Sequence, residues 1–358
     1  MLSFFFEVRC LSKRIVSIFI IIIINCNLIA CDANKKQRHE IEFFMLFDTV
    51  TQVVAYTETK EEFDNLSSII YNSLKEYHEL FDIYNNYENL NNLKTINDNA
   101  GIAAVKVNRE IIDLLNFAKQ EYENSDGLCN IALGSVLRIW HEYREYGIEF
   151  PESSSLPTME ELKFAAQHTD INNIIIDEKS STVYLADAQM SLDVGAIAKG
   201  FATERVCQLA IKKGVTSALV SVGGNVRAIG SKYRNGEPWN VGIQNPNKEH
   251  SKKIIYTTLL DNKSLVTSGD YQRYYIVDGK RYGHVIDPKT LMPAENFKSV
   301  TIICEDSAKA DSLSTIVYNM PFEEGFRYIN DIPDTEAIWV LQDDTIKCSD
   351  NFEDYIMK

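Results

Sequence analysis

The chain has 358 residues and is 45% hydrophobic, which is enough for one large domain or two modest domains with a buried core. Its formal net charge is −15 at pH 7. This acidity argues against nucleic-acid binding, because contacts to phosphates require clustered Lys and Arg side chains.

The N-terminus predicts export and lipidation. Lys13 and Arg14 precede an apolar run over residues 15–24, which is shorter than the roughly 20 residues that span a membrane. Leu-Ile-Ala then leads into Cys31, a pattern that resembles the bacterial lipoprotein signal. We expect a signal peptide over 1–30, a tether over 31–42 that is lipidated at Cys31, and a folded domain over 43–358. The protein would be anchored to the outer face of the bacterial cell membrane; an uncleaved signal anchor is the alternative.

The folded domain would keep four of the seven cysteines, and their spacing does not indicate a metal site. Two of them could oxidise in an exported protein, and the pairing stays open. They are Cys129, Cys207, Cys304 and Cys348.

Hydrophobic periodicity and turn residues predict an α+β fold. In chain order we expect a strand over 43–56, helices over 61–83 and 110–124, a buried turn leading into a helix over 127–140, a helix over 158–167 and a hairpin over 172–185. There follow a helix over 196–213 that ends at Gly214, a strand pair over 215–229, mostly antiparallel strands over 239–306, a helix over 308–318 and closing strands over 337–347. Strands come in runs rather than in strict alternation with helices, which favours α+β over a doubly wound sheet.

The block Asp193-Val-Gly-Ala-Ile-Ala-Lys199-Gly suits a diphosphate. Small residues open a predicted helix there, and Lys199 lies in its first turn. Free backbone N–H groups at a helix start attract anions, and lysine adds a positive charge. Ordinary helix–strand packing with a solvated lysine is the alternative.

Asp311 and Thr315 lie four residues apart on a predicted helix, so both side chains share one face. A carboxylate and a hydroxyl are hard oxygen ligands of the kind that Mg²⁺ prefers. The alternative is a plain surface helix.

Gly223 and Gly224 follow an apolar strand, where positive φ angles would let the backbone approach a ligand closely. The pattern is neither a dinucleotide fingerprint nor a P-loop, and a tight turn between strands is the alternative.

The most distinctive block is Thr267-Ser-Gly-Asp270-Tyr, which is followed by Gly283-His284-Val-Ile-Asp287-Pro. His284 is the histidine that lies beside a glycine, a carboxylate and a hydroxyl-rich turn. Imidazole titrates near neutral pH, so His284 could accept a proton from a hydroxyl. A purely structural histidine is the alternative.

Taken in order, these blocks resemble the ApbE family of flavin transferases, which move FMN from FAD onto a threonine of a target protein. The resemblance extends over about residues 43–318. It implies a Mg²⁺ site made by the backbone oxygen of Ala196 with Asp311 and Thr315. It implies His284 as the base and Asp287 as the residue that orients or tunes it. The implied FAD contacts are Phe47, Tyr84, Leu128, Cys129, Asn130, Asp193, Lys199, Gly223, Gly224, Thr267, Ser268, Gly269, Asp270 and Val285.

The chain departs from the family pattern at four places. Lys289 stands where the family often has Arg. Phe47-Asp48-Thr49 stands where many relatives have Met-Gly-Thr, and Leu128-Cys129-Asn130 stands where the commoner pattern is Ala-Phe-Asp. Leu291 occupies a position that is usually Gly. The resemblance therefore supports diphosphate binding more directly than adenine or ribose binding.

The resemblance implies an ApbE-like fold with mostly antiparallel sheets flanked by helices and an FAD cleft between two subregions. It implies Mg²⁺-dependent transfer of FMN from FAD to a threonine hydroxyl, with release of AMP. The expected partners are FAD, an acceptor protein such as a subunit of a membrane redox complex, and the membrane through the lipid anchor. FAD pyrophosphatase activity and simple flavin binding by a lipoprotein are the alternatives.

Overall fold

The computed structural model describes residues 36–232, 236–271 and 273–358. The predicted signal peptide and Cys31 lie outside these ranges. Within them, no helix combines the length and the apolarity needed to cross a membrane.

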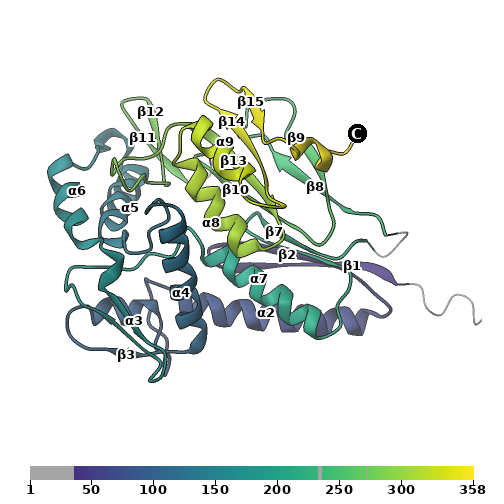
Figure 1. Cartoon of the computed structure of the whole chain (residues 1–358), viewed down its shortest axis with the longest axis horizontal. Coiled ribbons are helices and arrows are strands. Elements are labelled where there is room, and N and C mark those ends of the chain that lie inside the picture. The colour runs from purple at the N-terminus through teal and green to yellow at the C-terminus, as the bar shows by residue number, and fades with distance from the viewer. Residues whose placement is uncertain (1–35, 233–235, 272) are drawn as a thin grey trace, which may run out of the picture.

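An eight-stranded sheet forms the centre of the fold, with the strand order β1-β2-β6-β7-β10-β13-β14-β15 and antiparallel pairing throughout (Figure 1). Its strands are β1 (Gln37–Leu46), β2 (Thr49–Thr57), β6 (Ala218–Val222), β7 (Asn225–Ile229), β10 (Ser264–Gly269), β13 (Phe297–Cys304), β14 (Glu336–Leu341) and β15 (Ile346–Cys348).

Helices cover one face of this sheet. The apolar residues of α2 (Lys60–Phe81), α7 (Ala198–Lys212), α8 (Ser307–Tyr318) and α9 (Phe322–Asn330) join the inward side chains of the strands in the largest core cluster. Thr59 caps α2 by accepting a hydrogen bond from the Glu62 N–H. The other face is covered by the β8 (Trp239–Gln244) and β9 (Ile254–Leu260) hairpin and by Phe352 of the short helix η4 (Phe352–Tyr355).

A buried ion pair fixes the start of α8. The Arg227 Nε donates to Glu204 Oε2 at 3.0 Å, and the same oxygen accepts the Ser307 N–H at 2.9 Å. Arg227 is 1% exposed and Glu204 is 7% exposed. The pair therefore joins α7, β7 and α8 deep in the fold.

A second region of the fold is mainly helical and lies at the left in Figure 1. It contains α3 (Leu93–Asp98), α4 (Arg109–Asn124), α5 (Gly134–Glu149) and α6 (Met159–Ala165), with the small sheet of β3 (Val105–Lys106), β5 (Thr182–Leu185) and β4 (Ile174–Asp177) and the short helices η1 (Pro151–Ser153), η2 (Ala166–His168) and η3 (Ile171–Asn173). The hairpin of β11 (Tyr274–Val277) and β12 (Lys280–Gly283) packs against α5 through its own core cluster. Capping boxes at Asn92 and Thr158 start α3 and α6.

The α+β prediction is confirmed, and most predicted elements lie within a few residues of their expected ranges. The single strand expected over 43–56 is wrong. The chain reverses at Phe47 and Asp48, which both have positive φ, so β1 and β2 form a hairpin. Because β1 begins at Gln37, the tether expected over 31–42 ends earlier than predicted. Helices α3 and α9 were not expected.

Candidate functional site

Helices α7 and α8 cross so closely that only glycine fits at Gly200. A Cβ atom on Gly200 would lie 2.3 Å from the Ser307 carbonyl oxygen and 2.4 Å from the Asp311 Cβ. The Gly200 N–H donates to Asp311 Oδ2 at 2.7 Å, and the Lys199 Nζ lies 3.8 Å from the same oxygen. Asp311 is 4% exposed. Burial raises the pKa of Asp311, whereas Lys199 and the Gly200 N–H lower it.

The Gly200 N–H binds Asp311 in place of the helical hydrogen bond that would extend α7 toward its N-terminal side. In a regular helix the Gly200 N–H would bind the carbonyl of Ala196, four residues earlier. Among the described residues, no backbone N–H donates to that carbonyl. The predicted metal ligand Ala196 therefore has a carbonyl oxygen that no backbone N–H of the described residues binds, and the buried Asp311 carboxylate forms an ion pair with Lys199 at 3.8 Å.

The remaining donors near Asp311 are neutral. Thr315 follows one turn later on α8 and is half-buried. The amide nitrogen of Asn225 is buried without a hydrogen bond of normal geometry, yet its closeness to Asp311 favours the ionised carboxylate. The described residues contain no cluster of three or more His, Cys, Asp or Glu that could hold a metal. One carboxylate with hydroxyl and carbonyl oxygens fits Mg²⁺ rather than zinc.

Two turns meet beside this group. Gly223 and Gly224 both have positive φ, and a Cβ on Gly223 would lie 2.7 Å from the Thr49 hydroxyl oxygen. Thr49 directly follows the β1–β2 turn. The Phe47 N–H in that turn donates to His78 Nδ1 at 3.2 Å, and the two rings pack edge to face. The predicted flavin contact Phe47 is thus held at the same end of the sheet as Asn225.

The hydroxyl-rich block of β10 divides between the two faces of the sheet. The Ser268 hydroxyl bonds to the Ser314 hydroxyl of α8 at 2.7 Å, so Ser268 faces the helix that carries Asp311. Thr267 points the other way, because side chains alternate along a strand, and it bonds to Thr301 at 2.8 Å. The Thr267 side chain therefore lies on the opposite face of the sheet from Ser268, and its contact with FAD stays a prediction.

The end of β10 is crowded and leaves one acid poorly paired. A Cβ on Gly269 would lie 2.5 Å from the Tyr271 ring. Asp270 is half-buried, its Oδ1 lacks a hydrogen bond, and Arg281 lies 4.0 Å away. Burial raises the pKa of Asp270, and the charge of Arg281 lowers it. Asp270 therefore keeps a buried oxygen without a hydrogen bond at the end of β10.

His284 is held as a neutral imidazole. Its Nδ1 lies 3.3 Å from the Arg273 carbonyl oxygen, which can only accept, so Nδ1 carries the proton and Nε2 keeps its lone pair. Burial and the positive charges of Arg273, Arg144 and Lys199 together lower the pKa of His284 to about 4. Such a histidine can accept a proton at neutral pH.

Arg144 and Arg273 gather around the site without having been assigned a role from the sequence. Arg144 lies on α5 with its Nη2 at 2.6 Å from His141 Nδ1, and the His141 ring stacks at 5.6 Å on Tyr84. Burial lowers the pKa of Arg144, as does the charge of Arg273. Arg144 ends a block over residues 130–144 that resembles a recurrent pattern of the family, but the pattern assigned no role to the arginine itself, and Arg273 belongs to no such block.

Asp193 and Tyr84 lie close enough to Arg144 and Arg273 for both positive charges to act on their pKa values. Burial raises the pKa of Asp193, although the Gly195 N–H donates to its Oδ1 at 2.8 Å and both arginines favour its ionised form. Burial likewise raises the pKa of Tyr84, and Asp193 raises it further. The predicted FAD contacts Asp193, Tyr84 and Lys199 are therefore brought together with His284.

Asp287 caps the turn that follows His284. Its Oδ1 accepts the Lys289 N–H at 2.8 Å, and its Oδ2 accepts the Thr290 hydroxyl at 3.1 Å. These bonds close the turn that follows His284, and the role of Asp287 in orienting or tuning the imidazole stays a prediction. Leu291 in that turn has a φ of +63°, so the left-handed turn that glycine would favour is kept. The half-buried Val285 binds the Ala294 N–H through its carbonyl.

The block Leu128-Cys129-Asn130 is largely structural. Leu128 and Cys129 are 5% and 1% exposed, and burial raises the pKa of the Cys129 thiol to about 12. The Asn130 amide donates to the Thr169 carbonyl at 3.0 Å and accepts the Ala132 N–H at 2.9 Å. The prediction that these side chains bind FAD is therefore not supported by their contacts.

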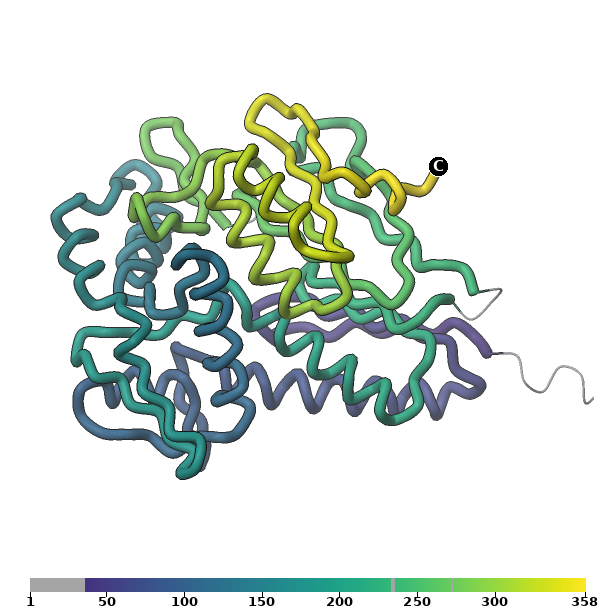
Figure 2. Tube along the Cα trace, viewed as in Figure 1, coloured from purple at the N-terminus to yellow at the C-terminus, as the bar shows by residue number. Residues whose placement is uncertain are grey.

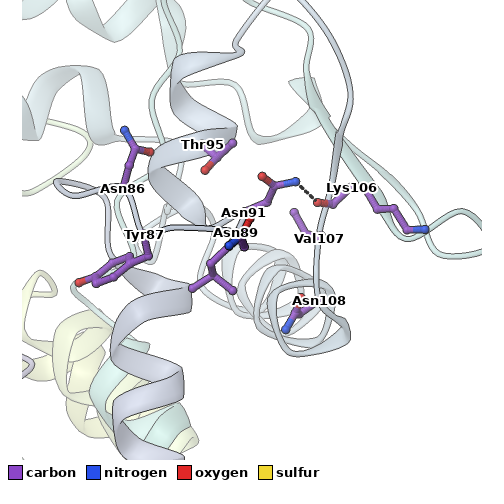
Figure 3. Close-up of a pocket in the computed structure, with 9 residues that line it drawn as sticks. Asn86, Tyr87, Asn89, Asn91, Thr95, Lys106, Val107 and Asn108 are labelled. Carbon is purple, nitrogen blue, oxygen red and sulfur yellow. Dashed lines mark hydrogen bonds between the residues drawn. The ribbon is translucent and has the colours of Figure 1, made fainter.

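A polar pocket of about 590 Å³ lies outside the predicted site residues (Figure 3). Asp82 organises its loop by accepting hydrogen bonds from the Tyr84 N–H, Asn85 and the Tyr87 hydroxyl. The same loop thus presents Tyr84 to the site and its other residues to the pocket. The lining residues are Asn86, Tyr87, Asn89, Leu90, Asn91, Thr95, Lys106, Val107 and Asn108.

Comparison with known proteins gives a consistent result. Residues 47–339 match the ApbE family. The chain is similar to the FAD:protein FMN transferase of Treponema pallidum (strain Nichols), with 30% identity over 354 residues and 94% of each chain covered. It is 31% identical over 278 residues to the protein of the same name from Klebsiella pneumoniae (strain 342), covering 77% of this chain and 82% of the relative.

Solved structures agree with the sequence relatives. An ApbE protein from Thermotoga maritima superposes with a TM-score of 0.78 at 30% identity, covering 90% of this chain and 100% of the other. The flavin transferase ApbE from Vibrio cholerae has a TM-score of 0.73 at 22% identity, covering 89% of this chain and 100% of the other, which shows a shared fold. The ApbE-like α+β prediction is confirmed.

Proposed function

Because this chain belongs to the ApbE family, we propose that it transfers the FMN part of FAD to a threonine hydroxyl of an acceptor protein. The hydroxyl oxygen bonds to the FMN phosphorus of FAD as the bond from that phosphorus to the bridging oxygen breaks. AMP leaves with the bridging oxygen, and the hydroxyl proton passes to a base. The reaction consumes FAD and acceptor and needs no oxidant or reductant.

His284 is the base in this proposal. Its Nε2 is unprotonated because Nδ1 donates to the Arg273 carbonyl and the pKa is lowered to about 4. A low pKa makes the imidazole a weak base, but it keeps the reactive form populated at neutral pH. Arg144, Arg273 and Lys199 supply positive charge where a diphosphate develops charge on its leaving group.

Mg²⁺ is the metal that the donor set suits, and when bound it would neutralise charge on the diphosphate. Asp311, Thr315 and the carbonyl of Ala196 would hold it. The single observation that supports this proposal is the hydrogen bond from the Gly200 N–H to Asp311, which takes up the amide that a regular helix would direct to the Ala196 carbonyl.

The test incubates the full chain in detergent with FAD, Mg²⁺ and a candidate acceptor subunit, then looks for a covalent flavin fluorescence band. We expect the band in the wild type and its loss on chelation of Mg²⁺. The control variant Lys289→Ala lies beyond the base on an exposed turn and should keep the activity. Verified FAD binding without a covalent band would reject the transfer.

FAD pyrophosphatase activity is the second candidate, because the same phosphate and metal groups would serve with water in place of threonine. It predicts FMN and AMP release without an acceptor. A flavin-binding lipoprotein would instead return FAD unchanged in the presence of Mg²⁺, and Asp311→Ala would hardly alter its flavin affinity. Chromatography of the flavin products separates the three outcomes.

We also propose that the protein is exported and lipidated at Cys31, which lies outside the described residues, and that its acceptor is a subunit of a membrane redox complex. The small residues before Cys31 support the first point. Labelling of cells with an alkyne fatty acid should tag the wild type and not Cys31→Ser. Mass spectrometry of membranes with and without this protein would identify the threonine that gains FMN.

A further inference from the structure

The central sheet has two very different edges. Strand β15 closes one edge with three residues, whereas β1 closes the other with ten. Within the described residues, no strand pairs with the outer side of β1. A long edge strand presents a row of unpaired backbone N–H and C=O groups, which is a template for an added strand.

Charged side chains protect only the first part of this edge. The solvent-facing positions of β1 read Arg38, Glu40, Glu42 and then Phe44. The inward-facing positions pack on α2, as the Phe43–Tyr71 ring contact shows. Charges on an edge discourage unwanted pairing. The part of the edge nearest the hairpin turn carries no such charge.

That unprotected part is apolar and exposed. Phe44 is 63% exposed and Met45 is 81% exposed, and Val50 opposite Phe44 is 44% exposed. Met45 sits at a register shift with a φ of +79°, where the strand bulges. Exposed apolar side chains beside a free strand edge are typical of a surface that binds another protein.

The edge leads directly into the candidate site. Phe47 and Asp48 follow Met45 at the end of the hairpin, and the charge of Asp48 contributes to the raised pKa of Tyr84. Thr49 contacts the turn at Gly223. That turn leads into Asn225, whose side chain lies close to Asp311. Figure 2 shows the purple hairpin running from the right-hand end of the molecule toward its helical region.

We propose that the outer edge of β1, from Phe43 to Met45, docks an extended segment of the acceptor protein by adding it as a ninth strand. The inference rests on the proposed transfer, because the occupant is the segment that carries the target threonine. Backbone pairing would set the path of the segment, and Phe44 and Met45 would contact its apolar side chains. A residue just past the paired stretch would reach the site.

The test compares Phe44→Lys/Met45→Lys with the control Ile346→Lys, which places a lysine charge on β15 at the opposite edge, and with the single variant Phe44→Lys, which adds the same one charge to β1. Both sets of side chains are exposed, at 63%, 81% and 36%, so folding should be preserved. We expect the KM for the acceptor subunit to rise about tenfold in the double variant. We expect kcat, the KM for FAD and the control to remain at wild-type values.

Hydrogen exchange on the wild-type chain gives a second, independent readout. An acceptor subunit with its target threonine changed to alanine binds without turnover and serves as the probe. Its addition should slow exchange of the β1 amides and leave those of β15 unchanged. Wild-type transfer with no change in either measurement would overturn the docking inference, whereas absence of transfer in the wild type would overturn the proposed function. Loss of self-association in the double variant, with an unchanged acceptor KM, would assign the edge to a second copy of this chain.

Discussion

The contact between α7 and α8 can be tested with Gly200→Ala. The added Cβ would sit 2.3 Å from the Ser307 carbonyl oxygen and 2.4 Å from the Asp311 Cβ, about 1 Å short of ordinary van der Waals contact. Neither neighbour is the end of a flexible side chain, so the helices must separate by roughly that distance. Overpacking of this kind costs about 1–3 kcal/mol of unfolding free energy. A displacement of about 1 Å near reacting groups can reduce the rate about 100-fold.

Urea unfolding and initial rates of FAD turnover measure both effects. The matched control is Gly325→Ala on α9, where the nearest atom lies 3.4 Å from the new Cβ and the backbone is helical. Alanine should stabilise that helix by about 0.5–1 kcal/mol and leave turnover unchanged. If Gly200→Ala matched the wild type in both stability and turnover, the close crossing would not determine the site geometry.

Three further predictions follow from the buried charges. Asp311→Asn should lower transfer about 100-fold or more while unfolding stability stays equal or rises, because burial already disfavours the ionised carboxylate; a parallel loss of stability would contradict this. Because the pKa of His284 is lowered to about 4, kcat/KM for FAD should be constant from about pH 8 to pH 5 and fall only below that range. A fall that begins near pH 6.5 would exclude His284 as the base with this pKa. In the His284→Ala variant, the fall of kcat/KM on the acid side of the profile should disappear. Arg227→Met should cost about 3–5 kcal/mol in urea unfolding because it leaves Glu204 buried and unpaired, and adding Glu204→Gln should recover most of the loss; equal instability of the single and double variants would argue against the pair.

Local patterns predicted the fold well because most elements follow simple periodicity. The β1–β2 turn escaped prediction because Phe47 and Asp48 adopt positive φ without the Asn-Gly or Asp-Gly sequence that usually marks such turns. Helix α3 is six residues long and rich in polar side chains, so its apolar spacing is too short to detect.

The sequence indicated the site residues that lie in a local motif with a constrained backbone. It did not indicate the residues that only the tertiary fold brings to the site. Asp311 and Lys199 lie together because a helix start and a close helix crossing fix them. Arg144 and Arg273 come from distant segments, and only the tertiary fold brings them to His284. Asp287 could not be distinguished from a catalytic acid by sequence, because a carboxylate that caps a turn has the same spacing.

The Asp311 carboxylate caps the N-terminal end of α7. By accepting the Gly200 N–H, it prevents that amide from turning back to Ala196. With a side chain that lacks an acceptor oxygen at position 311, the Gly200 N–H could donate to the Ala196 carbonyl instead. Helix α7 would then extend by residues on its N-terminal side, and the Ala196 oxygen would no longer be available to a ligand. Replacement of Asp311 would then remove two potential metal ligands, its own carboxylate and the Ala196 carbonyl. We therefore expect substitutions at position 311 to be tolerated less well than the loss of a single ligand would predict.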